Sequence, residues 1–452
     1  MAASALNPSS FHLSSRLVVA SAQCPSPLRS ERGSVGLLLR RATARTGVRR
    51  SCAPCCALPS GGATEQREAL KALLRAANLT QEPERITEMS AGFCNWVYRI
   101  DFPGQPPLVA KLFSPLAQLR LAPELRGAGD EAAGETGLGP RLIFRSADGL
   151  ITDYIDGSEL TEKDIHASGS SLSSSIAPLV ARLHGLPDIR SPASAKVTSE
   201  HMPVPLADAS VPRSPILWEF LEAMLSRIAE SPERLPPRIS LSKVREEVER
   251  MRRRCCALRL PVVSGHGDLK PSNVMRLSQD GSSASDAGGA VQCQFIDFEL
   301  SGDHYRGYDL FKLFRTADEP NVENMRSFLS TYATASAAID LPTTAAASDD
   351  PGRSSGGPTP LKKSDGRGAV TSVLLDELIA EAYAAEPLTW LEAAVFFLFA
   401  ISVYPSESDD WAPLALQRWE RYLASASAID ADGPVTVALL EARAQRGAAA
   451  AA

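Results

Sequence analysis

The sequence has no apolar run that approaches the roughly 20 residues needed to span a bilayer. The apolar stretch at residues 395–403 is short, and we expect it to form a buried helix. Cysteine is also scarce: the chain of 452 residues has eight, and those beyond residue 56 lack the spacing of a metal site. We therefore expect no membrane span and no cysteine metal centre, but free thiols at Cys94, Cys255, Cys256 and Cys293.

Residues 1–56 lack lysine and contain a single acidic residue, Glu31, beside eight arginines and many Ser and Ala. This composition is typical of an organelle transit peptide, and residues 48–53 look like a stromal processing site. We expect a disordered leader that directs import into the chloroplast, with the mitochondrion as the second choice and an ordinary basic tail as the alternative.

Without the leader, 39 basic and 52 acidic side chains remain, which gives a formal charge of −13. A protein this acidic is a poor candidate for binding nucleic acid or an anionic membrane surface. The sequence leaves the oligomeric state open.

The most informative residues lie between positions 264 and 309. The run Ser-Gly-His-Gly-Asp268-Leu-Lys-Pro-Ser-Asn273 places a carboxylate five positions before an amide, and Ile-Asp297-Phe-Glu299 adds a second carboxylate on a predicted strand. One carboxylate can orient an acceptor hydroxyl, while two oxygen ligands hold Mg²⁺ on nucleotide phosphates. The pattern predicts phosphoryl transfer.

These runs, together with His-Tyr-Arg-Gly-Tyr-Asp309, resemble the choline/ethanolamine kinase family within the aminoglycoside phosphotransferase-like, protein-kinase-like superfamily. The Tyr-Arg-Gly-aromatic-Asp segment is the sharpest discriminator. Protein kinases share Asp-Leu-Lys-Pro-Ser-Asn but follow their Asp-Phe-Gly with an activation loop and an Ala-Pro-Glu element, and this sequence has neither.

The resemblance implies an α+β, two-lobed protein-kinase-like fold, with a small antiparallel β lobe, a larger mainly α lobe and an ATP cleft between them. It also implies Mg-ATP-dependent phosphorylation of a small-molecule hydroxyl, an amino alcohol such as ethanolamine or choline being the first candidate. A kinase for an aminoglycoside- or sugar-like acceptor and a regulatory pseudokinase are the alternatives.

In the larger lobe the resemblance assigns the catalytic hydroxyl-orienting role to Asp268. Lys270 has either a catalytic role, neutralising the transferred group, or none. The Mg²⁺ ligands would be Asn273 and Asp297, with Glu299 for a second ion. His266 and Asp309 would support the loop that carries Asp268, and His184 would be a helix-end residue without a chemical role.

In the smaller lobe a turn at Gly92 and Asn95 resembles the family's phosphate-binding turn, because glycine lets backbone amides approach phosphate. Lys111 occupies the strand position that binds the α and β phosphates. Its buried ammonium needs an acidic partner on the next helix. Glu124 is the first choice and Glu131 the second, since Gly127, Gly129 and Gly134 make that helix a poor one. The remaining predicted nucleotide-binding residues are Asp153 and Ile155.

The acceptor pocket is where the resemblance weakens. The family binds a quaternary ammonium with a Trp-x-x-Trp pair and a Glu, and the matching positions here are Phe396, Phe399 and Thr316. Either Asp318 or Glu319 replaces the carboxylate, or the substrate is not choline. An ordinary helix core is the alternative reading of the two phenylalanines.

Breakers and periodicity predict the organisation of the chain. We expect an ATP-binding lobe at 57–155, a catalytic and acceptor lobe at 156–430, and a C-terminal helix with an Ala-rich tail at 431–452. Helices are predicted at 63–77, 176–184 and 216–229, strands at 85–102, 107–113, 138–144 and 150–155, and low-complexity inserts at 167–175, 278–290 and 334–369.

Overall fold

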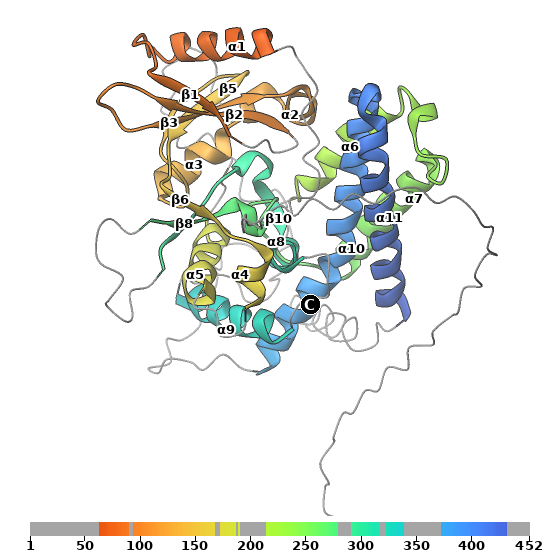
Figure 1. Cartoon of the computed structure of the whole chain (residues 1–452). Coiled ribbons are helices and arrows are strands. Elements are labelled where there is room, and N and C mark those ends of the chain that lie inside the picture. The colour runs from red at the N-terminus through yellow and green to blue at the C-terminus, as the bar shows by residue number, and fades with distance from the viewer. Residues whose placement is uncertain are drawn as a thin grey trace, which may run out of the picture. The chain divides into compact units, whose positions relative to one another are not determined.

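A computed structural model describes residues 63–89, 94–167, 172–186, 189, 214–278, 291–315, 322–338 and 372–431 (Figure 1). The chain divides into two units, Met1–Ala53 and Pro54–Ala452, and every described residue belongs to the second. The predicted transit peptide therefore lies outside the described residues. Within them, the four cysteines are free thiols, as expected.

The small lobe, residues 63–153, is built on a five-stranded antiparallel sheet. Its strands lie in the order β1 (Arg85–Glu88), β2 (Asn95–Asp101), β3 (Leu108–Phe113), β5 (Gly149–Asp153) and β4 (Leu142–Arg145). The helix α1 (Ala63–Ala76) crosses one face (Figure 1). It buries apolar side chains such as Leu70 and Leu74 against Tyr98 and Ile100 of β2. The predicted first helix and antiparallel sheet are confirmed.

Three short helices connect β3 to β4, namely α2 (Pro115–Arg120), the 3₁₀ turn η1 (Pro123–Leu125) and α3 (Ala128–Thr136). The helix α3 lies against η5 (Phe298–Leu300), a 3₁₀ turn of the large lobe. A Cβ atom at Gly129 would lie 1.9 Å from Ser301 Oγ and 2.7 Å from the Phe298 carbonyl oxygen. This glycine therefore permits the close contact between the lobes.

Two small sheets of the large lobe frame the loops that matter for function. The strand β7 (Val262–Gly265) pairs with β10 (Gly302–Tyr305), and β8 (Val274–Leu277) lies between β6 (Gly157–Glu159) and β9 (Cys293–Phe295). Residues 266–273, including the turn η4 (Pro271–Asn273), run from β7 to β8. Residues 296–301 run from β9 to β10. Because β7 pairs with β10 and β8 pairs with β9, the start of each loop lies beside the end of the other.

The rest of the large lobe is helical. Its elements are α4 (Glu162–His166), α5 (Leu172–His184), α6 (Leu217–Ile228), η3 (Pro232–Arg234), α7 (Leu241–Ala257), α8 (Arg306–Phe314), α9 (Val322–Ala338), α10 (Ser372–Val403), η6 (Pro405–Glu407) and α11 (Ser408–Ala431). With its antiparallel sheet and helical large lobe, the chain has the predicted α+β fold.

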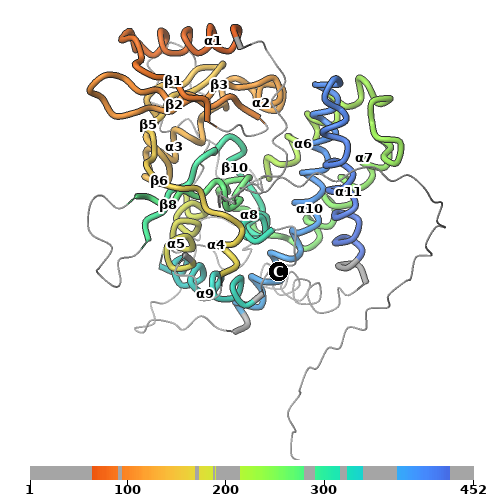
Figure 2. Tube along the Cα trace, viewed as in Figure 1, coloured from red at the N-terminus to blue at the C-terminus, as the bar shows by residue number. Residues whose placement is uncertain are grey.

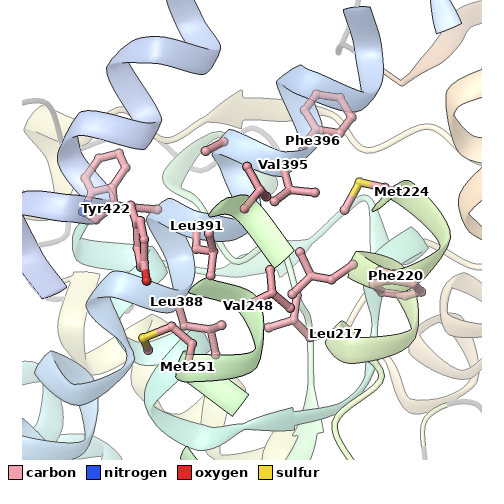
Figure 3. Packing of buried hydrophobic residues seen from close by; sticks show 14 of the residues in the cluster. Leu217, Phe220, Met224, Val248, Met251, Leu388, Leu391, Val395, Phe396 and Tyr422 are labelled. Atoms are coloured by element: carbon pink, nitrogen blue, oxygen red, sulfur yellow. The ribbon is translucent and has the colours of Figure 1, made fainter. Parts of the chain in front are cut away.

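The helix α10 is the core of the large lobe and packs against α6, α7, α8 and α11. Figure 3 shows Leu388, Leu391 and Val395 of α10 facing Leu217 of α6 and Val248 of α7. In the described part of the chain, α10 alone is long and apolar enough to cross a membrane, and 94% of its most apolar window is buried inside the protein. The expected buried helix at residues 395–403 is confirmed as its C-terminal end.

Two predicted insert boundaries are wrong. The helix α5 already begins at Leu172, and α9 continues to Ala338, inside the inserts predicted at 167–175 and 334–369. Tertiary packing explains the second case, because Tyr332 and Ala333 on the last turns of α9 are buried. The remaining insert residues 279–290 and 339–369, and the predicted C-terminal tail beyond Ala431, lie outside the described residues. Figure 2 follows the described path of the chain.

Candidate active site

The loop that follows β7 is held in place by Asp309 on α8. The Asp309 carboxylate accepts hydrogen bonds from the backbone N–H groups of His266, at 2.6 Å, and Gly267, at 2.9 Å. Gly267 has φ +77°, and a Cβ atom there would lie 2.3 Å from the Leu300 carbonyl oxygen. Only glycine fits this turn without strain. The supporting role predicted for Asp309 is confirmed.

Two histidines complete this support. The His266 ring lies between the two loops, with Nε2 3.0 Å from the Ile296 carbonyl oxygen, while Nδ1 accepts the Asp268 N–H at 3.3 Å. Burial lowers the pKa of His266. His184 Nε2 lies 3.4 Å from Asp309, and burial and the His184 hydrogen bond together leave the pKa of Asp309 at about 2. His266 therefore supports the loop, as predicted, whereas His184, predicted as a helix-end residue without a chemical role, contacts the Asp309 carboxylate that holds the loop.

Asp268 is the third residue of this loop, and both of its carboxylate oxygens are contacted. Oδ2 is 3.1 Å from Lys270 Nζ, and Oδ1 is 2.9 Å from Lys312 Nζ. Asn273 Nδ2 donates to the Asp268 carbonyl oxygen at 2.8 Å and to Oδ2 at 3.2 Å. Burial opposes the charged form, but the two ammonium groups outweigh it and hold the pKa of Asp268 far below its usual range. Asp268 is thus an ionised, oriented carboxylate.

Asp297 follows β9 and does not lie on the strand, which corrects the predicted placement. It has left-handed backbone torsions, φ +69° and ψ +56°, at the start of η5. This conformation turns its carboxylate toward the small lobe, where Lys111 Nζ lies 2.6 Å from Oδ1. Burial alone would lower the pKa of Lys111, but the carboxylates of Asp297 and Asp130 raise it. Lys111 and Asp297 thus form an ion pair between the lobes.

The helix acid beside Lys111 is Asp130, with its Oδ1 3.9 Å from Lys111 Nζ. The predictions of Glu124 and Glu131 are both wrong. Glu124 belongs to the separate turn η1. Glu131 lies one position further along α3 than Asp130, on another side of the helix, and its carboxylate is 3.0 Å from Arg145 Nε.

Glu299, the residue predicted for a second Mg²⁺, is contacted by donors from the small lobe. Arg120 Nη2 lies 2.9 Å from Oε1, and Asn95 Nδ2 donates to Oε2. Burial, together with the nearby Asp297 carboxylate, raises the pKa of Glu299. Asn95, predicted to approach phosphate, therefore turns its amide to Glu299, and metal binding by Glu299 stays a prediction.

The donor set suits a Mg²⁺ ion, which prefers oxygen ligands. Asn273 uses its amide nitrogen on Asp268, which leaves the amide oxygen as the atom for a cation. Asp297 offers Oδ2 beside the Oδ1 that contacts Lys111. The backbone N–H of Ile296 donates to the Asn273 carbonyl oxygen at 3.0 Å, so the segments that carry these two residues are adjacent.

The remaining residues predicted to bind the nucleotide are Gly92, Asp153 and Ile155. Gly92 is outside the described residues. The Asp153 carboxylate is partly exposed and pairs with Arg141 at 2.9 Å, while Ile155 is half-buried just beyond β5. Their predicted roles remain untested.

The acceptor residues are only partly described. Thr316 and Asp318 lie outside the described residues. Phe399 is 1% exposed and belongs to the apolar core around α10, and its assignment to the acceptor pocket stays a prediction. The Phe396 ring is covered by a cation of the protein itself, because the Arg120 guanidinium carbon lies 5.2 Å from the ring centroid.

Three residues of this site were missed by sequence reasoning: Arg120, Asp130 and Lys312. Arg120 ends a six-residue helix, and Asp130 sits in a glycine-rich segment with little helical signal. Lys312 gives no signal in the sequence, since a lysine in an amphipathic helix is ordinarily exposed.

The chain is similar to known choline/ethanolamine kinases. Residues 131–338 match the family model for choline/ethanolamine kinase. A choline/ethanolamine kinase of Rattus norvegicus is 24% identical over 341 residues, which cover 69% of this chain and 74% of that protein. A choline/ethanolamine kinase of Homo sapiens is 24% identical over 244 residues, which cover 51% of this chain and 54% of that protein.

Two solved structures share the fold. A choline kinase from Cryptosporidium parvum has a TM-score of 0.54 and 14% identity, covering 82% of this chain and 98% of that one. An ethanolamine kinase from Plasmodium vivax has a TM-score of 0.54 and 16% identity, and the match covers 80% of this chain and 88% of that one. At these identities the likeness establishes the common fold.

Proposed function

This chain is a relative of the choline/ethanolamine kinases, and we propose that it transfers the γ-phosphoryl group of Mg-ATP to the hydroxyl of a small amino alcohol. The observation that carries the proposal is the pair of ionised carboxylates on adjacent loops, Asp268 and Asp297. Asp268 has a lysine at each oxygen, and Asp297 has the inter-lobe contact with Lys111. Phosphoryl transfer requires this separation between orienting the acceptor and binding the nucleotide.

In the proposed reaction, Asp268 accepts a hydrogen bond from the acceptor hydroxyl and directs its oxygen at the γ-phosphorus. The new O–P bond forms as the bond between the γ-phosphorus and the β,γ-bridging oxygen breaks, and ADP leaves. The hydroxyl proton passes to Asp268 or to the phosphoryl oxygens. Since two ammonium groups stabilise the charged form of Asp268, its main contribution is orientation.

The phosphates would be bound by Lys111, and the exposed Lys270 can turn from Asp268 toward the transferred group. Asn273 and Asp297 would hold Mg²⁺, which neutralises negative charge on the phosphates.

Among amino alcohols, we favour ethanolamine over choline. The Phe396 face, which could attract a quaternary ammonium, is occupied by Arg120. A primary ammonium has three N–H donors and can bind to polar groups without an aromatic cage. We also propose plastid import, on the composition of residues 1–56.

Asp268→Asn tests the reaction. We expect ATP affinity to change less than about threefold and turnover to fall about 10² to 10⁴-fold, the range for a positioned acid or base. ATP binding and ADP formation are measured separately with ethanolamine, choline, sugars and aminoglycosides as acceptors.

Asp376→Asn is the matched control, because this carboxylate is exposed and pairs with Arg326 on the surface. More than about a tenth of wild-type turnover in Asp268→Asn, a loss below roughly 1.4 kcal/mol, would contradict the assigned role.

A further inference from the structure

Lys312 is a buried ammonium with four oxygen atoms around it. Its Nζ lies 2.9 Å from Asp268 Oδ1, 3.0 Å from the Gly267 carbonyl oxygen, 3.3 Å from the Tyr308 hydroxyl and 3.4 Å from Glu392 Oε2. Its side chain is 2% exposed. An ammonium has three N–H donors, so these four oxygens engage all of them. Lys312 cannot turn toward a nucleotide without losing several contacts.

Lys270 differs from Lys312 in this respect. It contacts the other oxygen of Asp268 at 3.1 Å, but its side chain is 41% exposed and comes from the same loop as Asp268. The Lys270 ammonium is carried on a flexible four-carbon stem and is only half-buried, so it can leave this contact more readily than Lys312. The two lysines therefore divide the Asp268 carboxylate into Oδ1, whose ammonium partner is fixed, and Oδ2, whose ammonium partner can leave while the Asn273 amide stays 3.2 Å away.

We propose that Lys312 is a positioning residue for the phosphoryl transfer: it holds Asp268 Oδ1 so that Oδ2 faces the acceptor hydroxyl when Lys270 turns to the phosphoryl group. The inference rests on the proposed function of Asp268. It goes further by assigning the orientation of that carboxylate to a residue of a different element, the helix α8.

The position of Lys312 on α8 supports this role. Asp309, one turn earlier on the same helix, accepts the Gly267 N–H at 2.9 Å, and Lys312 donates to the Gly267 carbonyl oxygen at 3.0 Å. The two side chains hold both ends of residue 267, directly before Asp268. Rotation of the Asp268 side chain is thus restricted by the helix that also fixes its backbone.

Glu392 on α10 keeps the ammonium in place from the opposite side. Its Oε2 accepts a hydrogen bond from the Tyr308 hydroxyl at 3.3 Å and lies 3.4 Å from Lys312 Nζ. Glu392 is also buried, at 6% exposure. Removing Lys312 alone would leave this carboxylate without its counter-charge, so the variant could unfold for reasons unrelated to catalysis.

The test therefore compares two variants that both lack the Glu392 charge. Glu392→Gln keeps the Lys312 contact with Asp268, and Lys312→Met with Glu392→Gln removes it. We expect kcat for ethanolamine to be at least tenfold lower in the double variant than in Glu392→Gln. Between these two variants, the Michaelis constant for ATP should differ by less than about twofold, and the Tm by no more than a few degrees. Lys312→Gln in the same background retains an N–H donor and should recover part of kcat.

A double variant with kcat within threefold of Glu392→Gln would overturn the inference. Equal losses in kcat and in ATP binding would also overturn it, because a purely structural lysine would act on both. Should the Met variant fail to fold, Lys312→Gln supplies the comparison, and a kcat equal to that of Glu392→Gln refutes the role. A failure of the proposed function is distinguishable, since the wild type would then phosphorylate no amino alcohol.

Discussion

Replacing Arg306 by methionine should destabilise the protein strongly. Arg306 Nε and Nη2 donate to Glu381 Oε2 at 2.8 Å and Oε1 at 2.6 Å, and the side chains are 4% and 1% exposed. Loss of one partner from a buried ion pair costs about 3–5 kcal/mol, because the other charge stays buried without it. At roughly 2–4 °C per kcal/mol for a domain of 150–250 residues, and somewhat less for a larger one, Tm should fall by about 5–15 °C.

The double variant Arg306→Met, Glu381→Met tests the reason for this loss. Two apolar side chains of similar size remove both charges of this pair, so the double variant should be more stable than Arg306→Met alone. Arg326→Met is the control, since the exposed Arg326–Asp376 pair joins α9 to α10 and should contribute about 0–1 kcal/mol.

Calorimetry and urea unfolding of the four proteins give the comparison. The reasoning fails if Arg306→Met costs less than about 1 kcal/mol, or if the double variant is no more stable than the single one.

Three further predictions concern the site and the leader. Asp309→Asn should lower stability at neutral pH. Burial disfavours the charged form of the Asp309 carboxyl, but the hydrogen bond from His184 favours it, and the folded pKa is about 2 against an ordinary 3.8. The stability advantage of the wild type should therefore be full above pH 3.8 and fade as the pH falls through about 2, which urea titrations measure. Choline should show a lower kcat/KM than ethanolamine because Arg120 covers Phe396, and a kcat/KM for choline equal to or above that for ethanolamine would contradict this. A fluorescent fusion of residues 1–60 should enter plastids, while a protein that begins at residue 57 should stay in the cytosol; a cytosolic leader fusion would remove the localisation proposal.

The catalytic loop could be predicted because its chemistry is local. Asp268 and Asn273 are five positions apart, and the turn η4 between them brings the Asn273 amide within 2.8 Å of the Asp268 carbonyl oxygen. Asp297 could be predicted from its motif for a similar reason. The left-handed backbone conformation of Asp297 could not be predicted, because non-glycine residues rarely adopt that conformation and nothing in the motif requires it.

The partner of Lys111 could not be predicted, because the relevant helix contradicts local propensity. Glycine disfavours a helix by about 1 kcal/mol relative to alanine, so the sequence around Gly129 predicts a poor helix. In the structure the missing Cβ is what lets α3 approach η5, and this contact places Asp130 beside Lys111. Packing between distant segments overrides propensity here, and it moves the acidic partner from Glu124 to Asp130.

The segment from Arg306 to Lys312 shows why the sharpest sequence signal lay outside the catalytic loop. Arg306 pairs with Glu381, and a Cβ at Gly307 would lie 2.2 Å from the Glu381 carbonyl oxygen, so both residues fix α8 against α10. Asp309 and Lys312, on the same nine-residue helix, hold the loop that carries Asp268. One short helix thus determines where the Asp268 carboxylate, which we propose orients the acceptor, lies relative to α10. A side chain at Gly307 would therefore shift Asp268 without touching it, and would impair transfer through geometry alone.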